Sequence, residues 1–177
     1  MSNPGDDTAL IIPVVLPGAL DSLRRRATPD ATEGLSPHVT LLYPFERPEA
    51  LDDGIRGHLK GILAGHRPFS FRLVKRGEWP GVLFISVEPE TPFRALYRDL
   101  LAAFPAFPIH RGMLDYVPHL TIAVGQSASA IGVRNDPAWG LLPVTCEAQV
   151  ADLVVRGPDG WAVRWRFDLR MPPRRKG

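Results

Sequence analysis

Cysteine is nearly absent from this sequence, and it contains no long hydrophobic run. The single cysteine, Cys146, excludes an internal disulfide and a thiolate metal cluster, so we expect a small buried apolar side chain there. No stretch approaches the roughly 20 apolar residues that a membrane-spanning helix needs. The N-terminus carries Asp6 and Asp7 where a secretory signal would be basic. The sequence therefore predicts a cytoplasmic protein with no membrane partner.

The chain also has little net charge and an ordinary composition. Its formal charge is +2, from 21 Lys and Arg against 19 Asp and Glu, which is weak evidence for an anionic partner. Apolar residues make up 45% and charged residues 23%, which excludes wholesale disorder and a fibrous structure. A length of 177 residues suits one domain, so we expect residues 1–177 to form a single monomeric body.

Hydrophobic periodicity predicts a mixture of strands and helices. The strongest helix signal begins at Thr91 and Pro92, a cap residue followed by proline in the first turn. The predicted strands are Thr8 to Leu16, Pro37 to Tyr43, Phe69 to Lys75, Val82 to Val87, Pro118 to Val124, Val144 to Val155 and Trp161 to Leu169. The other predicted helices are Ala19 to Arg26, Glu49 to Gly65 and a weak one near Ser127 to Val133.

One short pattern occurs twice in the sequence. The segments Pro37 to Leu41 and Pro118 to Ile122 share a proline, a histidine, an aliphatic residue, a threonine and a second aliphatic residue. Each copy lies on a predicted strand, where residues two apart point to the same face about 6.5 Å apart. The aliphatic residues then point into a core, and the residues that project together are His38 with Thr40 and His119 with Thr121.

These residue types indicate phosphate chemistry. An imidazole titrates near neutral pH, and a hydroxyl donates a hydrogen bond. Two such strands side by side would bracket a phosphate, with the histidines supplying acid and base and the threonines donating to the non-bridging oxygens. The structural alternative for each histidine is a strand residue whose ring is bonded to backbone. No third residue has the companion spacing of a zinc ligand, so no metal is expected.

The two His-x-Thr motifs, His38-Val39-Thr40 and His119-Leu120-Thr121, resemble those of the 2H phosphoesterase superfamily, which includes the 2′-5′ RNA ligase family and the cyclic phosphodiesterases. The resemblance implies an α+β fold of two similar lobes, with two mostly antiparallel sheets forming a central cleft and helices packed outside. It also implies metal-free catalysis without a cofactor, with His119 as base, His38 as acid, and Thr40 and Thr121 binding the phosphate.

The chain departs from the better-known RNA ligase members at one place. Those members tend to carry an arginine shortly after the second motif, where this chain has Ala123, Val124, Gly125 and Gln126. Without a metal, the phosphate charge that develops during reaction needs another cation. Sequence alone does not choose among the arginines that the predicted arrangement brings near the site, which are Arg72, Arg76 and Arg111.

Four residues are further candidates for substrate contact. Trp79 lies at a predicted hairpin tip, where it either covers the core or offers a platform for a base. Tyr43 and Tyr116 flank the motifs and either pack or reach the cleft. Arg111 precedes the second motif.

The resemblance implies a hydrolase that opens a cyclic phosphodiester. Its expected partner is a nucleotide or RNA end with a 2′,3′-cyclic phosphate, or an ADP-ribose cyclic phosphate. Two alternatives stay open: a 2′-5′ RNA ligase, and a nucleotide- or RNA-binding module with little turnover.

Overall fold

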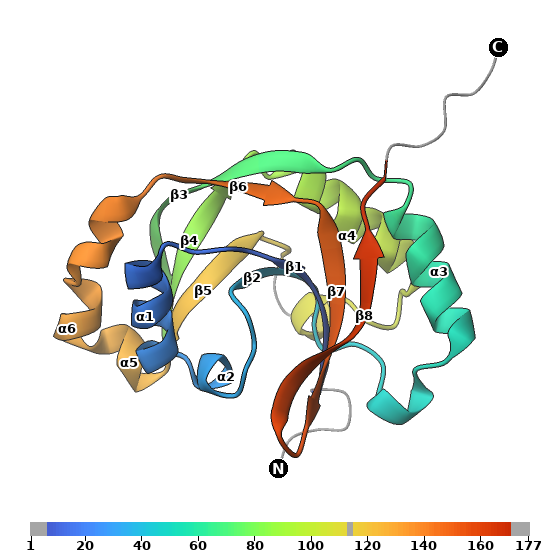
Figure 1. Cartoon of the computed structure of the whole chain (residues 1–177), viewed down its shortest axis with the longest axis horizontal. Coiled ribbons are helices and arrows are strands. Elements are labelled where there is room, and N and C mark those ends of the chain that lie inside the picture. Colours follow the sequence, from blue (N-terminus) through green and yellow to red (C-terminus); the bar gives the residue numbers. More distant parts are fainter. Residues whose placement is uncertain (1–6, 113–114, 171–177) are drawn as a thin grey trace.

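The computed structural model describes residues 7–112 and 115–170, which form two four-stranded antiparallel sheets with helices around them (Figure 1). The strands are β1 (Thr8–Pro13), β2 (His38–Leu42), β3 (Phe69–Trp79), β4 (Val82–Glu88), β5 (His119–Val124), β6 (Val144–Ala148), β7 (Val150–Gly157) and β8 (Gly160–Asp168). The α-helices are α1 (Gly18–Ala27), α2 (Pro29–Thr32), α3 (Asp53–Leu63), α4 (Thr91–Ala103), α5 (Gln126–Ser129) and α6 (Ile131–Arg134). Three 3₁₀ turns complete the described residues: η1 (Pro48–Ala50), η2 (Ile109–Gly112) and η3 (Pro137–Leu141).

The two sheets place their motif strands in equivalent positions. One sheet has the order β2-β1-β7-β8 and the other β5-β4-β3-β6, so β2 and β5 are both edge strands. These two edges lie side by side where the sheets meet (Figure 1). The two histidine motifs therefore lie next to each other in the molecule, as the predicted α+β fold with two sheets requires.

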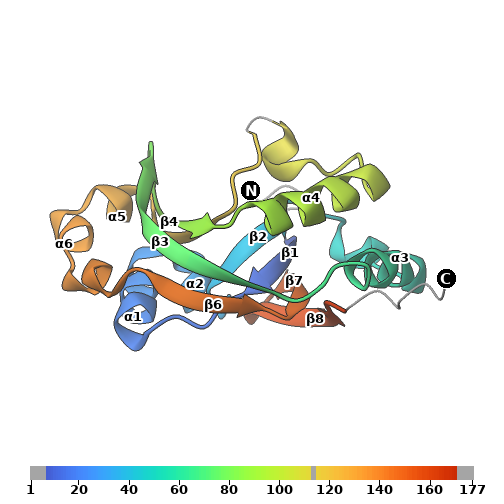
Figure 2. The same cartoon turned by 90° about the horizontal axis from the view of Figure 1, so that it is seen from above.

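The helices lie outside the sheets and link the two halves. In Figure 2, α1, α5 and α6 gather at one end of the molecule and α3 lies at the other. Helix α1 follows β1 of the first sheet but packs against β5 of the second, whereas α4 follows β4 of the second sheet but packs against β2 of the first. Each motif strand is thus covered by a helix from the opposite half. No helix of the described residues is long and apolar enough to cross a membrane.

Side chains alternate along the motif strands as predicted. The aliphatic residues of the two motifs are fully buried in the main core: Val39, Leu41, Leu120 and Ile122. The histidines and threonines between them are only partly buried and face the other way. Burying the aliphatic face fixes the register of each strand, because a slip of one residue would turn these side chains to the polar face.

Several predictions of secondary structure were wrong in detail. The helix predicted for Glu49 to Gly65 begins only at Asp53, after the turn η1, and the weak helix predicted near Ser127 to Val133 is the two short helices α5 and α6. The strand predicted for Val144 to Val155 is two strands in different sheets, because the chain passes at Gln149 from β6 in one sheet to β7 in the other. The apolar face predicted for β8 is interrupted, since this edge strand leaves Val163 50% exposed. The loop predicted after α1 contains the short helix α2, whose Pro29 occupies the first turn.

Two backbone contacts connect α2 to the start of β8. The N–H of Trp161 donates to the carbonyl of Glu33 at 2.7 Å, immediately after α2. Gly160 has φ +102°, and a Cβ there would lie 2.2 Å from the same carbonyl oxygen. Only glycine therefore allows β8 to approach α2 this closely.

We expect Gly160→Ala to lower the free energy of unfolding by about 2 to 4 kcal/mol, because it adds a left-handed backbone penalty and displaces a hydrogen-bonded carbonyl. Gly57→Ala is the matched control, since Gly57 lies inside α3 with open space around it. That change should raise stability by about 0.5 to 1 kcal/mol. Urea denaturation measures both, and equal effects would contradict the close approach.

Candidate active site

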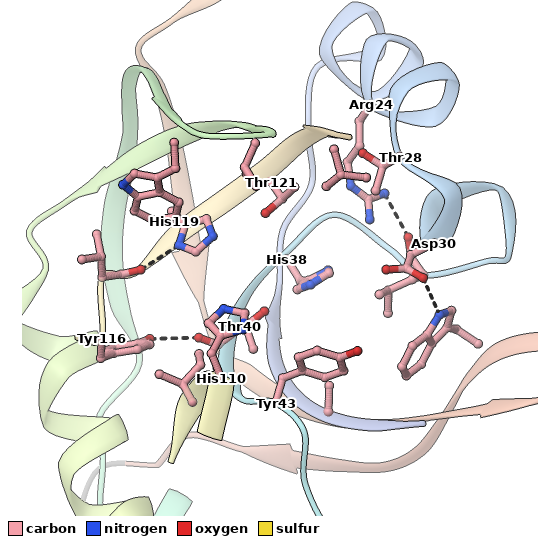
Figure 3. Close-up of a pocket in the computed structure, with 18 of the residues that line it drawn as sticks. Arg24, Thr28, Asp30, His38, Thr40, Tyr43, His110, Tyr116, His119 and Thr121 are labelled. Carbon is pink, nitrogen blue, oxygen red and sulfur yellow. Dashed lines mark hydrogen bonds between the residues drawn. The ribbon is translucent and has the colours of Figure 1, made fainter. Parts of the chain in front are cut away.

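A cavity of about 650 Å³ lies beside the two motif strands (Figure 3). It is lined by seven of the eight residues that the sequence selected: His38, Thr40, Tyr43, Trp79, Tyr116, His119 and Thr121. The eighth, Arg111, lies in η2, but its side chain is outside the described part of the structure. The fold thus brings together two motifs that are far apart in the sequence.

The two histidines are held in the same way. In each, Nδ1 lies 2.7 Å from the backbone carbonyl oxygen two residues earlier, Ser36 for His38 and Val117 for His119. A carbonyl only accepts, so Nδ1 carries the proton in both rings. Nε2 is then the unprotonated nitrogen of each neutral ring. The ring-to-backbone bond that the structural alternative described is present, and it leaves Nε2 of each imidazole as the nitrogen available for chemistry.

Burial keeps both imidazoles neutral. The pKa of His38 is lowered from 6.5 to about 4, chiefly by burial, with further lowering by the charges of Arg24 and His119. The pKa of His119 is also lowered by burial, and the charge of His110 adds to this. The effect of the His119 charge on His38 places the two histidines within electrostatic reach of each other.

The motif threonines offer unused hydroxyl groups. Thr40 and Thr121 line the cavity, and neither hydroxyl hydrogen-bonds to another described residue. The backbone carbonyl of Thr40, by contrast, accepts a hydrogen bond from the Tyr116 hydroxyl at 3.0 Å. Both threonine hydroxyls are therefore available to a ligand.

The aromatic residues differ in their surroundings. Trp79 is 37% exposed and packs on Phe84 in a tilted arrangement, with ring centroids 4.1 Å apart. Its ring also meets that of His119 edge to face at 4.7 Å, so it lies at the rim beside one catalytic candidate. Tyr116 is buried, stacks on Tyr97 at 4.2 Å and uses its hydroxyl on Thr40, which is mainly a packing role.

Sequence reasoning did not identify the arginine that lines the cavity, Arg24 of α1. Its side chain is 2% exposed and donates to the carbonyls of Leu35 at 2.9 Å and Ser36 at 3.3 Å. Among the described residues, no carboxylate forms an ion pair with it. The periodicity of the Ala19 to Arg26 helix offered a signal, because Arg24 falls on its buried face beside Leu20 and Leu23.

Two of the three arginines considered from sequence lie elsewhere. Arg72 pairs with Glu88 at 3.3 Å, and Arg76 lies over the ring of Trp139 at 5.7 Å. Neither lines the cavity. Their strand β3 is separated from the motif strand β5 by β4, so the expected pairing of the two halves does not bring them to the cavity.

His110 is a third histidine on the cavity wall. It has φ +47°, which is rare for a residue with a side chain, and its N–H donates to the carbonyl of Tyr43 at 2.9 Å. Burial lowers its pKa. No group of three His, Cys, Asp or Glu within residues 7–112 and 115–170 is arranged to hold a metal ion.

Comparisons with known proteins agree with this arrangement. A Bacillus cytotoxicus protein described as "Putative phosphoesterase Bcer98_0945" is 30% identical over 112 residues, which cover 58% of this chain and 59% of that protein. The crystal structure of TT0787 of Thermus thermophilus superposes with a TM-score of 0.61 at 22% identity, covering 93% of this chain and 98% of that one. The E. coli LigT structure complexed with 3′-AMP has a TM-score of 0.58 at 16% identity, with coverages of 93% and 98%.

The solved structures are too distant in sequence to establish more than a common fold. The match to a family covers most of the chain, because residues 12–159, which include both motifs, match the 2′-5′ RNA ligase superfamily. Together with the phosphoesterase relative, this match shows that the chain belongs to the 2′-5′ RNA ligase superfamily of 2H phosphoesterases.

Proposed function

We propose that this protein hydrolyses a cyclic phosphodiester, with His38 and His119 as its acid–base pair. The observation that carries the proposal is the matched presentation on one cavity of two imidazoles and of two threonine hydroxyls that no described residue hydrogen-bonds. A phosphate between the motif strands would meet both Nε2 atoms and both hydroxyls. No other set of described groups in the cavity offers two equivalent proton-transfer groups.

The reaction requires two proton transfers at one phosphorus. His119 Nε2 takes a proton from water while the water oxygen bonds to phosphorus. The bond from phosphorus to one ribose oxygen breaks, and His38 gives that oxygen a proton. Thr40 and Thr121 donate hydrogen bonds to the non-bridging oxygens, and the product carries a single terminal phosphate. These roles follow the resemblance to cyclic phosphodiesterases.

Arg24 would supply the positive charge of the site. Asp21 and Asp30 act on it without forming an ion pair, and burial still lowers its pKa. A buried charge that no opposite charge contacts is unfavourable. An anion that enters the cavity compensates this charge, which favours its binding. Arg24 thereby takes the part of the arginine that is missing after the second motif. In the same position it lowers the pKa of His38 until the anion arrives.

A ligase that joins RNA ends through a 2′-5′ linkage is the second candidate, because it would run nearly the reverse chemistry on the same groups. Hydrolysis is favoured because Ala123 to Gln126 lack the arginine of the better-known RNA ligase members. The nucleotide bound in the LigT structure supports a nucleotide ligand under either activity. A binding module with little turnover would bind a 2′,3′-cyclic nucleotide tightly and release no product.

We expect His38→Ala and His119→Ala each to lower turnover of 2′,3′-cyclic nucleotides by about 10²- to 10⁴-fold, measured in excess EDTA. Thr40→Val and Thr121→Val should each reduce the stabilisation of the transition state by about 1.5 to 3 kcal/mol, the value of a hydrogen bond to a charged group. His58→Ala is the control, because His58 is exposed on α3. Near-normal turnover in a folded His38 or His119 variant would refute the mechanism, and activity that EDTA abolishes and a divalent ion restores would refute its metal independence.

The pH dependence of kcat/KM should peak in acid, below pH 6.5. That profile reports the two ionisations of the free enzyme, and burial lowers both histidine pKa values, that of His38 to about 4. Above both pKa values the acid has lost its proton, and below both the base has gained one. A profile measured on a 2′,3′-cyclic nucleotide with its maximum above pH 7 would contradict this.

Removing the charge of Arg24 should weaken catalysis and raise the pKa of His38. We expect Arg24→Met to lower kcat/KM by about 10²-fold, whereas Arg24→Lys, which keeps the charge, should lose less. The pKa of His38, followed by NMR of its ring, should rise in the Met variant because a repelling charge is gone. Arg25→Met on the exposed face of α1 is the control. An unchanged His38 pKa together with unchanged kcat/KM would show that Arg24 is only structural.

A further inference from the structure

The cavity extends past His38 to a wall that the phosphate chemistry does not use. Five residues form this wall, which we name the Asp30 subsite: Ala9, Asp30, Leu35, Tyr43 and Trp161. Figure 3 shows Asp30 and Tyr43 on the side of His38 that faces away from His119. The subsite is assembled from the first strand, α2, the segments around β2 and the start of β8.

The base of the subsite is apolar and firmly packed. Ala9 and Leu35 are 4% and 6% exposed, and they belong to a small core cluster with Ile11 and Val154. Tyr43 and Trp161 pack against that cluster and are themselves partly exposed to the cavity. Two aromatic rings over a small apolar floor suit a flat, weakly polar group, and a nucleobase is such a group.

One charged group faces this apolar surface. Asp30 Oδ1 accepts a hydrogen bond from the indole N–H of Trp161 at 3.2 Å, and no described residue hydrogen-bonds Oδ2. The backbone N–H of Leu35 donates to the carbonyl of Asp30 at 2.9 Å, and Trp161 is bonded through its own N–H to Glu33. The carboxylate is therefore fixed, and its second oxygen is an acceptor that a ligand can use.

The opposite end of the cavity is lined differently. Beyond His119 the lining residues are Trp79, Pro80, Val82 and Val124, which carry no carboxylate. The other carboxylate of the described lining is Asp115, which is exposed just before β5. The end next to His38 is therefore the one where a hydrogen bond to an indole holds a carboxylate in place.

We propose that the Asp30 subsite binds the base of the substrate and selects bases with an exocyclic amino group. This inference rests on the proposed function and names its substrate class. Adenine, cytosine and guanine each present an amino group that donates to a carboxylate, whereas uracil presents carbonyl oxygens at the equivalent positions. A nucleoside bound there has its ribose beside His38, where the departing ribose oxygen needs its proton.

The test compares kcat/KM for the 2′,3′-cyclic phosphates of adenosine, cytidine, guanosine and uridine. The wild-type protein should prefer one or more of the three amino-bearing bases over uracil by at least about tenfold, because a carboxylate placed for an exocyclic amino group meets a carbonyl oxygen of uracil, whose one Watson–Crick donor is the ring N3–H. In Asp30→Asn the amide oxygen still accepts from Trp161, and the amide NH₂ faces the cavity as a donor. The kcat/KM for the uridine substrate should then rise, and the kcat/KM for the amino-bearing bases should fall about tenfold.

Asp159→Asn is the matched control, because Asp159 is exposed in the turn between β7 and β8 and should leave all four rates unchanged. Equal kcat/KM for the four bases, or an unchanged preference in Asp30→Asn, would overturn the subsite while the phosphoesterase activity stands. If no cyclic nucleotide is hydrolysed, the proposed function fails. Calorimetric binding of the four nucleoside 3′-monophosphates then decides the inference, and equal affinities would overturn it.

Discussion

The site depends on the burial of two sheet edges against each other. An edge strand carries backbone groups that no neighbouring strand pairs, and leaving such groups buried without partners is costly. Side chains from the opposite half supply the missing donors. The Thr28 hydroxyl donates to the carbonyl of Ile122 on β5 at 2.6 Å, and the Tyr116 hydroxyl donates to the carbonyl of Thr40 on β2 at 3.0 Å. These two bonds cross between the halves and fix the strands that carry the histidines.

The two halves are similar in design and differ in charge. Arg24 of α1 donates to the carbonyls two and three residues before His38, and Arg94 of α4 donates to the carbonyl three residues before His119 at 2.7 Å. Arg94 is partly exposed and pairs with Glu90 at 2.6 Å, whereas Arg24 is buried and has no such partner among the described residues. The arginine on the His38 side therefore has no contacting carboxylate, unlike its counterpart. Desolvation makes that charge a strong attraction for an anion and keeps the adjacent imidazole neutral.

Different parts of the cavity are suited to phosphate chemistry and to the choice of substrate. The motif residues lie in its middle, and they are the ones that we propose to handle the phosphate. The walls on either side come from other segments, with Trp79 beyond His119 and the Asp30 subsite beyond His38. Gly160 allows the close approach of β8 that brings Trp161 to Asp30. Under the proposed roles, a change in these walls would alter which molecule is bound without disturbing His38 and His119.

The sequence by itself determined the local features of this protein. Alternation of apolar and polar residues located the motif strands and the faces on which His38 and His119 project, because side-chain direction on a strand has a period of two. The repeated motif also selected the two histidines that we propose as the catalytic pair and, through the family resemblance, the two-sheet fold. Only the tertiary structure decided that the segment from Val144 to Val155 divides between two sheets, since local pattern does not record which sheet a strand joins. It also decided that Arg24, rather than Arg72 or Arg76, lines the cavity, and that Asp30 meets Trp161 from the far end of the chain. Those contacts join residues far apart in sequence, and their charge and burial exist only once the two sheets have packed.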